Sequence, residues 1–235
     1  MRILDPATTL ESVQFLRSLK PADAKKLMQL ARVRHAHPRD RLWSTGDPVA
    51  GPVLIVSGLA RLFLEHDQGG ETPFACLWTG DIPAPSLQAQ KDWRVSAAAV
   101  TPVIHAIFPI EPFLEACVRT PQLGQQVLND LATVYYNRSY WEAMLRIIPL
   151  KQRLLKLLAR MADEVGTPNE EGILLDFPLT HQTVADLSWV QRDQAGRVLN
   201  ELADEGYIVA RPRFRWLIPD RRRLGPQPMI APLVP

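Results

Sequence analysis

A short segment near the C-terminus brings two arginines and an acid together at helical spacing: Arg192, Asp193 and Arg197. Asp193 and Arg197 lie four residues apart, so on a helix they share one face. An arginine can donate two parallel hydrogen bonds to a guanine edge, and a carboxylate can accept one from a cytosine amino group. Asp193 and Arg197 could instead form a simple surface ion pair. The cluster therefore offers either base recognition or a solvated ion pair.

The flanking sequence predicts two helices that would position this cluster. Thr180 is a good N-cap for a short first helix with one apolar face. Residues 188–191 form the turn, and a second helix runs from about Arg192 to a glycine C-cap at Gly206. In a helix-turn-helix, the leading residues of the second helix enter the major groove. The segment therefore predicts a DNA-recognition helix.

Basic residues and two strand-like runs follow the second helix. Residues 207–209 and 214–218 read as strands, with a turn at 211–213 between them. A helix-turn-helix followed by such a hairpin is a winged helix, whose wing residues Arg211 and Arg213 are expected to contact phosphates rather than bases. The alternative for this basic stretch is a solvated tail. Its arginines are Arg211, Arg213, Arg215, Arg221, Arg222 and Arg223.

Residues 121–148, bounded by Pro121 and Pro149, predict one long helix. Its heptad seam consists of Val127, Leu131, Val134, Arg138, Trp141, Leu145 and Ile148. A seam with one charged interruption is typical of a two-stranded coiled coil, and it predicts a homodimer. In this interpretation a second stripe with Leu128 and Tyr135 covers the preceding domain. The alternative is a helix packed only on its own domain.

Short strands separated by turns dominate the region from residue 33 to residue 108. They predict an antiparallel sandwich or barrel. The predicted strands are 41–43, 53–56, 60–64, 72–78, 95–100 and 103–108. Residues 8–32 predict short helices, one of which opens at Pro21.

The bulk composition limits the classes of protein. The chain has 235 residues, 46% of them hydrophobic and 22% charged, with a net charge of +2, which is typical of a folded chain of one or two domains. Cys76 and Cys117 argue against a disulfide framework, a zinc finger or a cysteine-ligated cluster. Because the sequence contains no apolar run of roughly 20 residues and no signal peptide, we expect no membrane partner and a cytoplasmic location.

The segment from Gln191 to Ile208 closely resembles the recognition helix of the cyclic-AMP receptor protein and fumarate–nitrate reduction regulator family. Residues 54–63 resemble that family's β-roll hairpin, residues 96–103 its last roll strands, and residues 121–148 its dimer helix. The resemblance thus extends to about Asp220 and implies an α+β fold. The implied parts are a β-roll sensor domain with N-terminal helices (1–118), which is a cyclic-nucleotide-binding-like jelly roll, a dimerisation helix (119–148), a winged helix-turn-helix (149–220) and a proline-rich tail (221–235).

The resemblance implies a homodimeric transcription regulator of the activator type rather than an enzyme. Its partners would be a palindromic site in double-stranded DNA, RNA polymerase and a small-molecule effector. Carried over by position, the resemblance implies that Arg192, Asp193 and Arg197 read bases. It also implies that Thr180, His181 and Gln191 contact the DNA backbone. Trp189 occupies a position where many members have a turn glycine, so a positive φ there would be strained.

The effector site departs from the family's cyclic-nucleotide pattern. Asp81 is shorter than the expected glutamate, and Trp93 stands where the phosphate-binding arginine would be, with Arg94 one residue further on. These residues and Ser96 are the candidate effector contacts, although Trp93 and Trp78 are better interpreted as core. The pattern argues against cyclic AMP.

Other cofactors are also poorly supported. The N-terminus lacks the cysteines of an iron–sulfur site, and His35 and His37 read as a surface pair without a metal. Haem binding is a remaining alternative, with Cys76, His66 and His105 as the candidate ligands. Two further alternatives are a β-sandwich or cupin-type enzyme and a ligand-binding module without DNA binding. The enzyme needs a clustered acid–base or metal set, which the sequence does not supply.

Overall fold

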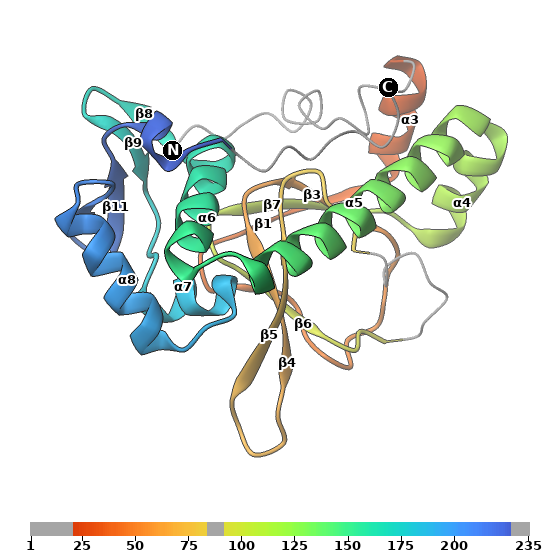
Figure 1. Cartoon of the computed structure of the whole chain (residues 1–235). Coiled ribbons are helices and arrows are strands. Elements are labelled where there is room, and N and C mark those ends of the chain that lie inside the picture. The colour runs from red at the N-terminus through yellow and green to blue at the C-terminus, as the bar shows by residue number, and fades with distance from the viewer. Residues whose placement is uncertain (1–20, 84–91, 227–235) are drawn as a thin grey trace.

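The computed structural model describes residues 21–83 and 92–226, and its N-terminal half is a roll of two antiparallel sheets (Figure 1). One sheet has the order β1 (Arg32–Ala36), β7 (Val103–Ile107) and β3 (Val53–Ser57). The other has the order β2 (Arg41–Trp43), β6 (Ser96–Ala99), β4 (Ala60–Glu65) and β5 (Glu71–Leu77). All six predicted strands are confirmed within a residue or two at their ends.

Alternating apolar side chains from both sheets fill the interior of the roll. Ile55, Leu62 and Ala97 belong to one buried cluster that joins the two sheets. The turn from β3 to β4 requires Gly58, because its φ is +96° and a Cβ would lie 2.2 Å from the carbonyl oxygen of Pro102. The tight turn thus leads from β3 of one sheet into β4 of the other, and the far end of the β4–β5 hairpin projects beyond the sheet (Figure 1).

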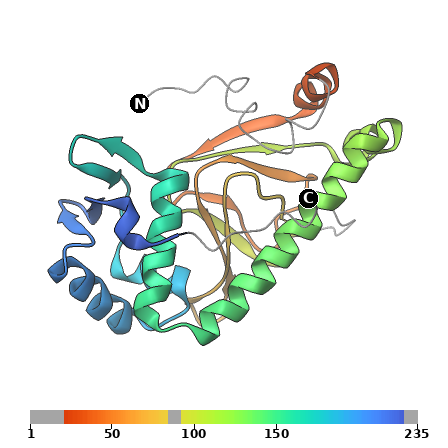
Figure 2. The same ribbon diagram turned by 45° about the horizontal axis from the view of Figure 1, so that its top comes forward.

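Within the described ranges, three helices flank the roll: α3 (Pro21–Leu30), α4 (Ile110–Arg119) and α5 (Pro121–Ile147). The predicted helix opening at Pro21 and the long helix from Pro121 are both confirmed, whereas the helices expected before residue 21 lie outside the described residues. Figure 2 shows α5 running along the roll from α4 at one end to the start of the next helix at the other.

The face of α5 that packs on the roll differs from the expected one. Val127 is only 7% exposed and belongs with Leu123 to the core beneath Leu54 and Phe108. Leu131 packs against the same cluster. Val127 is therefore covered by its own chain, and the prediction that it faces a partner is wrong, whereas Leu131 is only partly buried and its predicted partner contact stays a prediction. Both stripes of α5 are apolar, so only tertiary packing could distinguish them.

The C-terminal domain contains three helices and a four-stranded sheet. The helices are α6 (Leu150–Val165), α7 (His181–Ser188) and α8 (Arg192–Asp204). The sheet order is β10 (Val209–Arg211), β11 (Arg215–Ile218), β9 (Gly172–Leu175) and β8 (Thr167–Asn169). The winged helix-turn-helix is confirmed, and the sheet has two strands, β8 and β9, that the sequence pattern did not reveal.

The two domains share one apolar core. Leu59, Trp78 and Val100 of the roll belong to the same buried cluster as the inner faces of α6, α7 and α8. The guanidinium of Arg160 on α6 lies 4.1 Å from the centroid of the Trp78 ring. The interpretation of Trp78 as core is therefore confirmed, and the winged domain lies directly against the roll.

The residues after β11 are ordered rather than tail-like. Arg221–Leu224 form the 3₁₀ turn η2, and Leu224 is buried in the shared core. The expectation that the tail begins at Arg221 is wrong for these four residues, because an apolar side chain anchors them. Among the helices that the structure describes, none is long and apolar enough to cross a membrane.

Candidate nucleic-acid interface

The two helices of the helix-turn-helix are held by a cap and a close crossing. The Thr180 hydroxyl accepts a hydrogen bond from the Thr183 amide at 3.1 Å, which confirms Thr180 as the N-cap of α7. Gly196 lies beneath the ring of His181, where a Cβ would stand 2.9 Å from Nδ1. The missing side chain at Gly196 thus lets α7 and α8 approach closely.

The turn between these helices has the strained backbone that the sequence suggested. Trp189 has φ 55° and ψ 51°, in the left-handed region. Its amide donates to Ala185, and Arg153 Nη1 of α6 donates to the Ser188 carbonyl at 3.1 Å. These bonds fix the turn, although a tryptophan there costs about 1 kcal/mol or more.

The leading face of α8 carries charges that have no ion-pair partner among the described residues. Arg192, Asp193 and Arg197 are all exposed, and within residues 21–83 and 92–226 none of them makes an ion pair. The surface ion pair between Asp193 and Arg197 is therefore absent from the structure. Beneath them, Ala195, Leu199 and Leu202 are fully buried, so the face is rigidly supported.

Gln191 and Gln194 close the first turn of the same helix. The Gln191 amide donates to Oε1 of Gln194 at 3.3 Å, and both side chains are exposed. Glu201 and Glu205 bind Lys151 of α6 at 2.7 and 2.6 Å, which ties the far half of α8 to the domain. The N-terminal half of α8 thus faces outward while its C-terminal half is bound internally.

The wing turn lies one residue later than expected. Arg211 ends strand β10, where it pairs with Arg215, and the turn consists of residues 212–214. Pro212 lacks an amide hydrogen, and both Arg213 (φ 63°) and Phe214 (φ 59°) are left-handed, so none of the three continues the ladder. Phe214 is therefore a turn residue and not, as predicted, a strand residue.

The arginines of this basic stretch are not equivalent. Arg211 Nη2 lies 2.8 Å from Glu171, and Arg215 Nε lies 2.9 Å from Asp176. Arg213 is exposed and has no ion-pair partner among the described residues. Of the two predicted phosphate contacts, only Arg213 thus presents an unneutralised charge, whereas the charge of Arg211 is balanced internally.

Two arginines of η2 make hydrogen bonds that stabilise the fold. Arg221 binds Asp163 of α6 through two hydrogen bonds of 2.7 and 2.6 Å. Arg223 donates to the carbonyl oxygens of Gly206 and Glu205, at the end of α8. Gly206 has φ +73°, which confirms the predicted glycine at this helix end. Arg221 and Arg223 are therefore bound to the protein itself.

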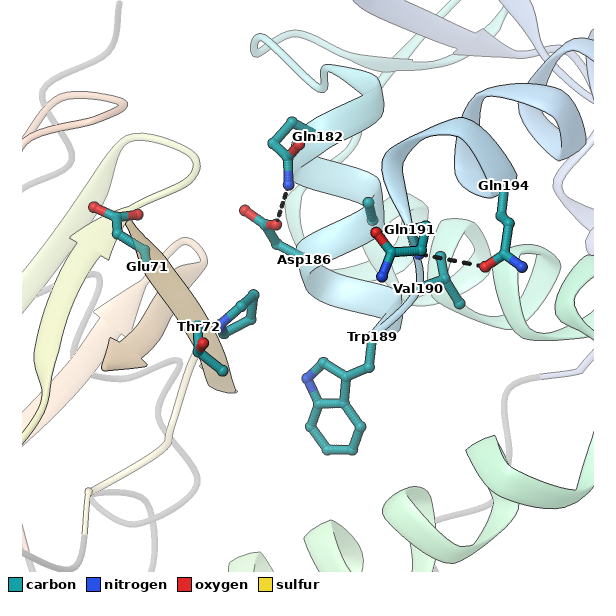
Figure 3. Close-up of a pocket in the computed structure, with 10 residues that line it drawn as sticks. Glu71, Thr72, Gln182, Asp186, Trp189, Val190, Gln191 and Gln194 are labelled. Carbon is teal, nitrogen blue, oxygen red and sulfur yellow. Dashed lines mark hydrogen bonds between the residues drawn. The ribbon is translucent and has the colours of Figure 1, made fainter. Parts of the chain in front are cut away.

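A hollow of about 520 Å³ separates the β4–β5 hairpin from the helix-turn-helix. Figure 3 shows Glu71 and Thr72 on the hairpin side, with Asp186 and Trp189 opposite them. At its edge Arg61 Nη1 lies 3.9 Å from Asp186 Oδ2, and Arg61 also pairs with Glu71. Burial raises the pKa of Asp186, although a hydrogen bond from Gln182 and the charge of Arg61 act against this.

Most candidate effector residues of the roll already make contacts within the roll itself. Trp93 is 4% exposed and stacks on Trp43 with centroids 4.2 Å apart, so its interpretation as a core residue is confirmed. Ser96 is fully buried and donates to Glu65 at 2.5 Å. Asp81 accepts a bond from the Trp78 amide at 2.8 Å, and Arg94 is exposed.

The candidate haem residues are spread over the roll. His105 lies in β7 of one sheet and Cys76 in β5 of the other, while His66 bonds Thr72 in the hairpin turn. Within the described ranges, no group of three or more metal-ligating side chains is assembled. Burial, followed by the charges of Arg34 and His35, lowers the pKa of His105 to about 4.

The geometry defines a DNA-binding regulator: a recognition helix with exposed charges, a wing, and a roll that packs against α6 and α7. Residues 152–225 match the family model for the Crp-like helix-turn-helix domain. The chain is also similar to curated transcription regulators along most of its length. It is 27% identical to the global nitrogen regulator of Synechococcus elongatus over 70% of this chain and 75% of that one. It is 23% identical to the transcriptional activator protein FnrL of Cereibacter sphaeroides, over 86% and 84% of the two chains.

Solved structures show the same fold. The c-di-GMP responsive global regulator CLP of Xanthomonas campestris aligns with a TM-score of 0.66 and 18% identity, over 86% of this chain and all of that one. FixK2 of Bradyrhizobium japonicum aligns with a TM-score of 0.66 and 15% identity, over 83% and 95% of the two chains. Residues 152–225 thus form a Crp-like helix-turn-helix domain, and the curated proteins that the chain resembles along most of its length are transcription regulators rather than enzymes.

Proposed function

We propose that the chain is a homodimeric regulator that reads a palindromic DNA site through α8, with Arg192, Asp193 and Arg197 as the base-reading residues. The observation that carries this is that these three exposed charges make no ion pair within the part of the chain that the structure describes, on a helix whose inner face is fully packed. Thr180, His181 and Gln191 border the same face and would contact the phosphate backbone.

The test is selection of bound sequences from random duplex DNA by the full-length protein. Two copies of α8 related by a two-fold axis predict an enriched palindrome whose half-sites lie about one helical turn apart. Arg197→Ala should remove the enrichment, whereas Arg119→Ala, a matched change on exposed α4, should retain it. Enrichment of no palindrome by the folded wild-type protein would contradict the proposal.

The dimer contact is proposed for the outward stripe of α5. Leu128 and Tyr135 lie one heptad apart and are 67% and 75% exposed, whereas Val127 is covered by the roll. Ile148, just after α5, is half-buried, and the side chains of Val134, Arg138, Trp141 and Leu145 lie outside the described residues. Leu128→Glu should yield monomers in analytical ultracentrifugation, and Val118→Glu on α4, which is 80% exposed in the wild type, should remain dimeric. A dimeric Leu128→Glu protein would refute this contact.

Control by a small effector at the roll and contact with RNA polymerase complete the proposal. The physical route for effector control is the junction between the hairpin and α7, where Arg61, Glu71 and Asp186 meet. A shift of the hairpin would change the ion-pair distances to α7 directly. The effector would therefore act by displacing β4 and β5 relative to the helix-turn-helix.

A further inference from the structure

The tip of the wing contains two consecutive strained residues. Arg213 and Phe214 have φ values of 63° and 59°, in a region that favours glycine and is costly for an aromatic residue. Phe214 is 61% exposed, so little burial of its ring offsets this cost. Strained residues of this kind cluster at sites of function, where the side chain itself is used.

The tip is fixed relative to the helix-turn-helix. The carbonyl oxygen of Phe214 accepts a 2.8 Å hydrogen bond from the amide of Leu179, the residue before the N-cap of α7. The indole of buried Trp216 donates back to the Leu179 carbonyl at 3.0 Å. Two bonds to one residue thus hold the wing beside the start of α7, and its tip has a defined place next to the proposed DNA-binding face.

The charge at the tip also points to DNA. Arg211 and Arg215, on either side of the turn, are balanced by Glu171 and Asp176, whereas Arg213 has no ion-pair partner in the described part of the chain. The tip therefore presents one unpaired guanidinium directly beside one exposed aromatic ring. Narrow A·T-rich minor grooves attract arginine, and apolar side chains pack or wedge against base steps there.

We propose that the wing tip is a second DNA-reading element, with Arg213 inserted in the minor groove that flanks each half-site and Phe214 packed against the sugars and base edges. The groove next to the major groove that holds α8 is a minor groove, which is where a tip fixed beside α7 would lie. The consequence is a preference for A·T pairs just outside the bases read by α8. This inference rests on the proposed function.

The test compares affinities for the selected palindrome with A·T-rich and with G·C-rich flanks. Wild-type protein should prefer the A·T flanks by about tenfold. Phe214→Gly should lose most of this preference and also raise the midpoint of thermal unfolding, because glycine adopts positive φ without strain. Arg213→Ala should bind both sites more weakly and lower the slope of log affinity against log salt by about one. Arg222→Ala, an exposed arginine outside the wing, is the matched control for charge.

The outcomes separate this inference from the proposed function. Palindrome binding that is intact and equal for both flanks in wild type would overturn the wing-tip inference alone. Absence of any palindrome binding would overturn the proposed function and the inference with it. A Phe214→Gly protein that keeps the full flank preference would also overturn the role of the ring, and Phe214→Asn, which tolerates the same backbone, provides a second variant for that comparison.

Discussion

The winged domain and the β-roll use their polar groups in opposite ways. On the leading turns of α8 and at the wing tip, Arg192, Asp193, Arg197 and Arg213 are exposed and make no ion pair among the described residues. In the roll, the polar groups nearest the candidate effector site are bound internally, as Ser96 is to Glu65 and Asp81 to the Trp78 amide. A charge without an internal partner on a rigid element is available to an external partner, whereas a satisfied one stabilises the fold.

The largest effect should come from His105 in the roll. Its pKa is lowered to about 4 from 6.5, and neither ring nitrogen has a hydrogen-bond partner among the described residues. The unfolded chain therefore binds this proton more tightly than the folded chain. Stability should fall by about 2–3 kcal/mol as the pH drops from about 6.5 to 4. Urea unfolding across this pH range measures the effect.

His105→Leu should flatten that part of the pH profile, and His37→Gln, a change at an exposed position, should leave it unchanged. If the His105→Leu protein kept the full loss of stability at low pH, the proposed contrast between the roll and the winged domain would be contradicted. The acid-labile group would then lie outside the interior of the roll.

The next effect separates two arginines of the winged domain. Arg221 makes two short bonds to Asp163, so Arg221→Ala should lower the free energy of unfolding by about 2 kcal/mol. Arg197 makes no such bond to any residue that the structure describes, and Arg197→Ala should change the free energy of unfolding by less than about 0.5 kcal/mol. Chemical denaturation of both variants measures the two changes in the free energy of unfolding. Similar losses of stability would show that Arg197 is part of the fold.

The smallest effect concerns the strained turn. Trp189→Gly should be more stable than Trp189→Ala by about 1 kcal/mol, because both variants lose the indole and only glycine relieves the left-handed backbone. The difference between their thermal midpoints isolates the backbone contribution. Equal midpoints would mean that the turn at Trp189 is not strained.

Local signals explain why much of this architecture is predictable from the sequence. The Thr180 cap, the Gly206 helix end and the strand pattern of the roll depend on neighbours within a few residues, and the structure confirms all three. The leading charges of α8 are predictable for the same reason, since a helical period places them opposite buried Leu199.

The structure differs from the sequence-based predictions where interacting residues are distant in the sequence. The pairing of Arg211 with Glu171 spans 40 residues, and that of Arg221 with Asp163 spans 58, so neither arginine could be recognised as internally balanced. The choice between the two apolar stripes of α5 depends on the surface of the roll, which is likewise distant in the sequence. Short strands such as β8 carry too weak a pattern to be detected.

The central claim is that Arg197 reads a base, and a double-mutant cycle tests it most directly. Affinities would be measured for wild type and Arg197→Ala on the selected site and on sites with each base pair of a half-site replaced in turn. We predict that Arg197→Ala removes discrimination at one base pair, worth about 1–3 kcal/mol, and leaves it intact elsewhere. A uniform loss at every position, or no loss at all, would contradict the claim.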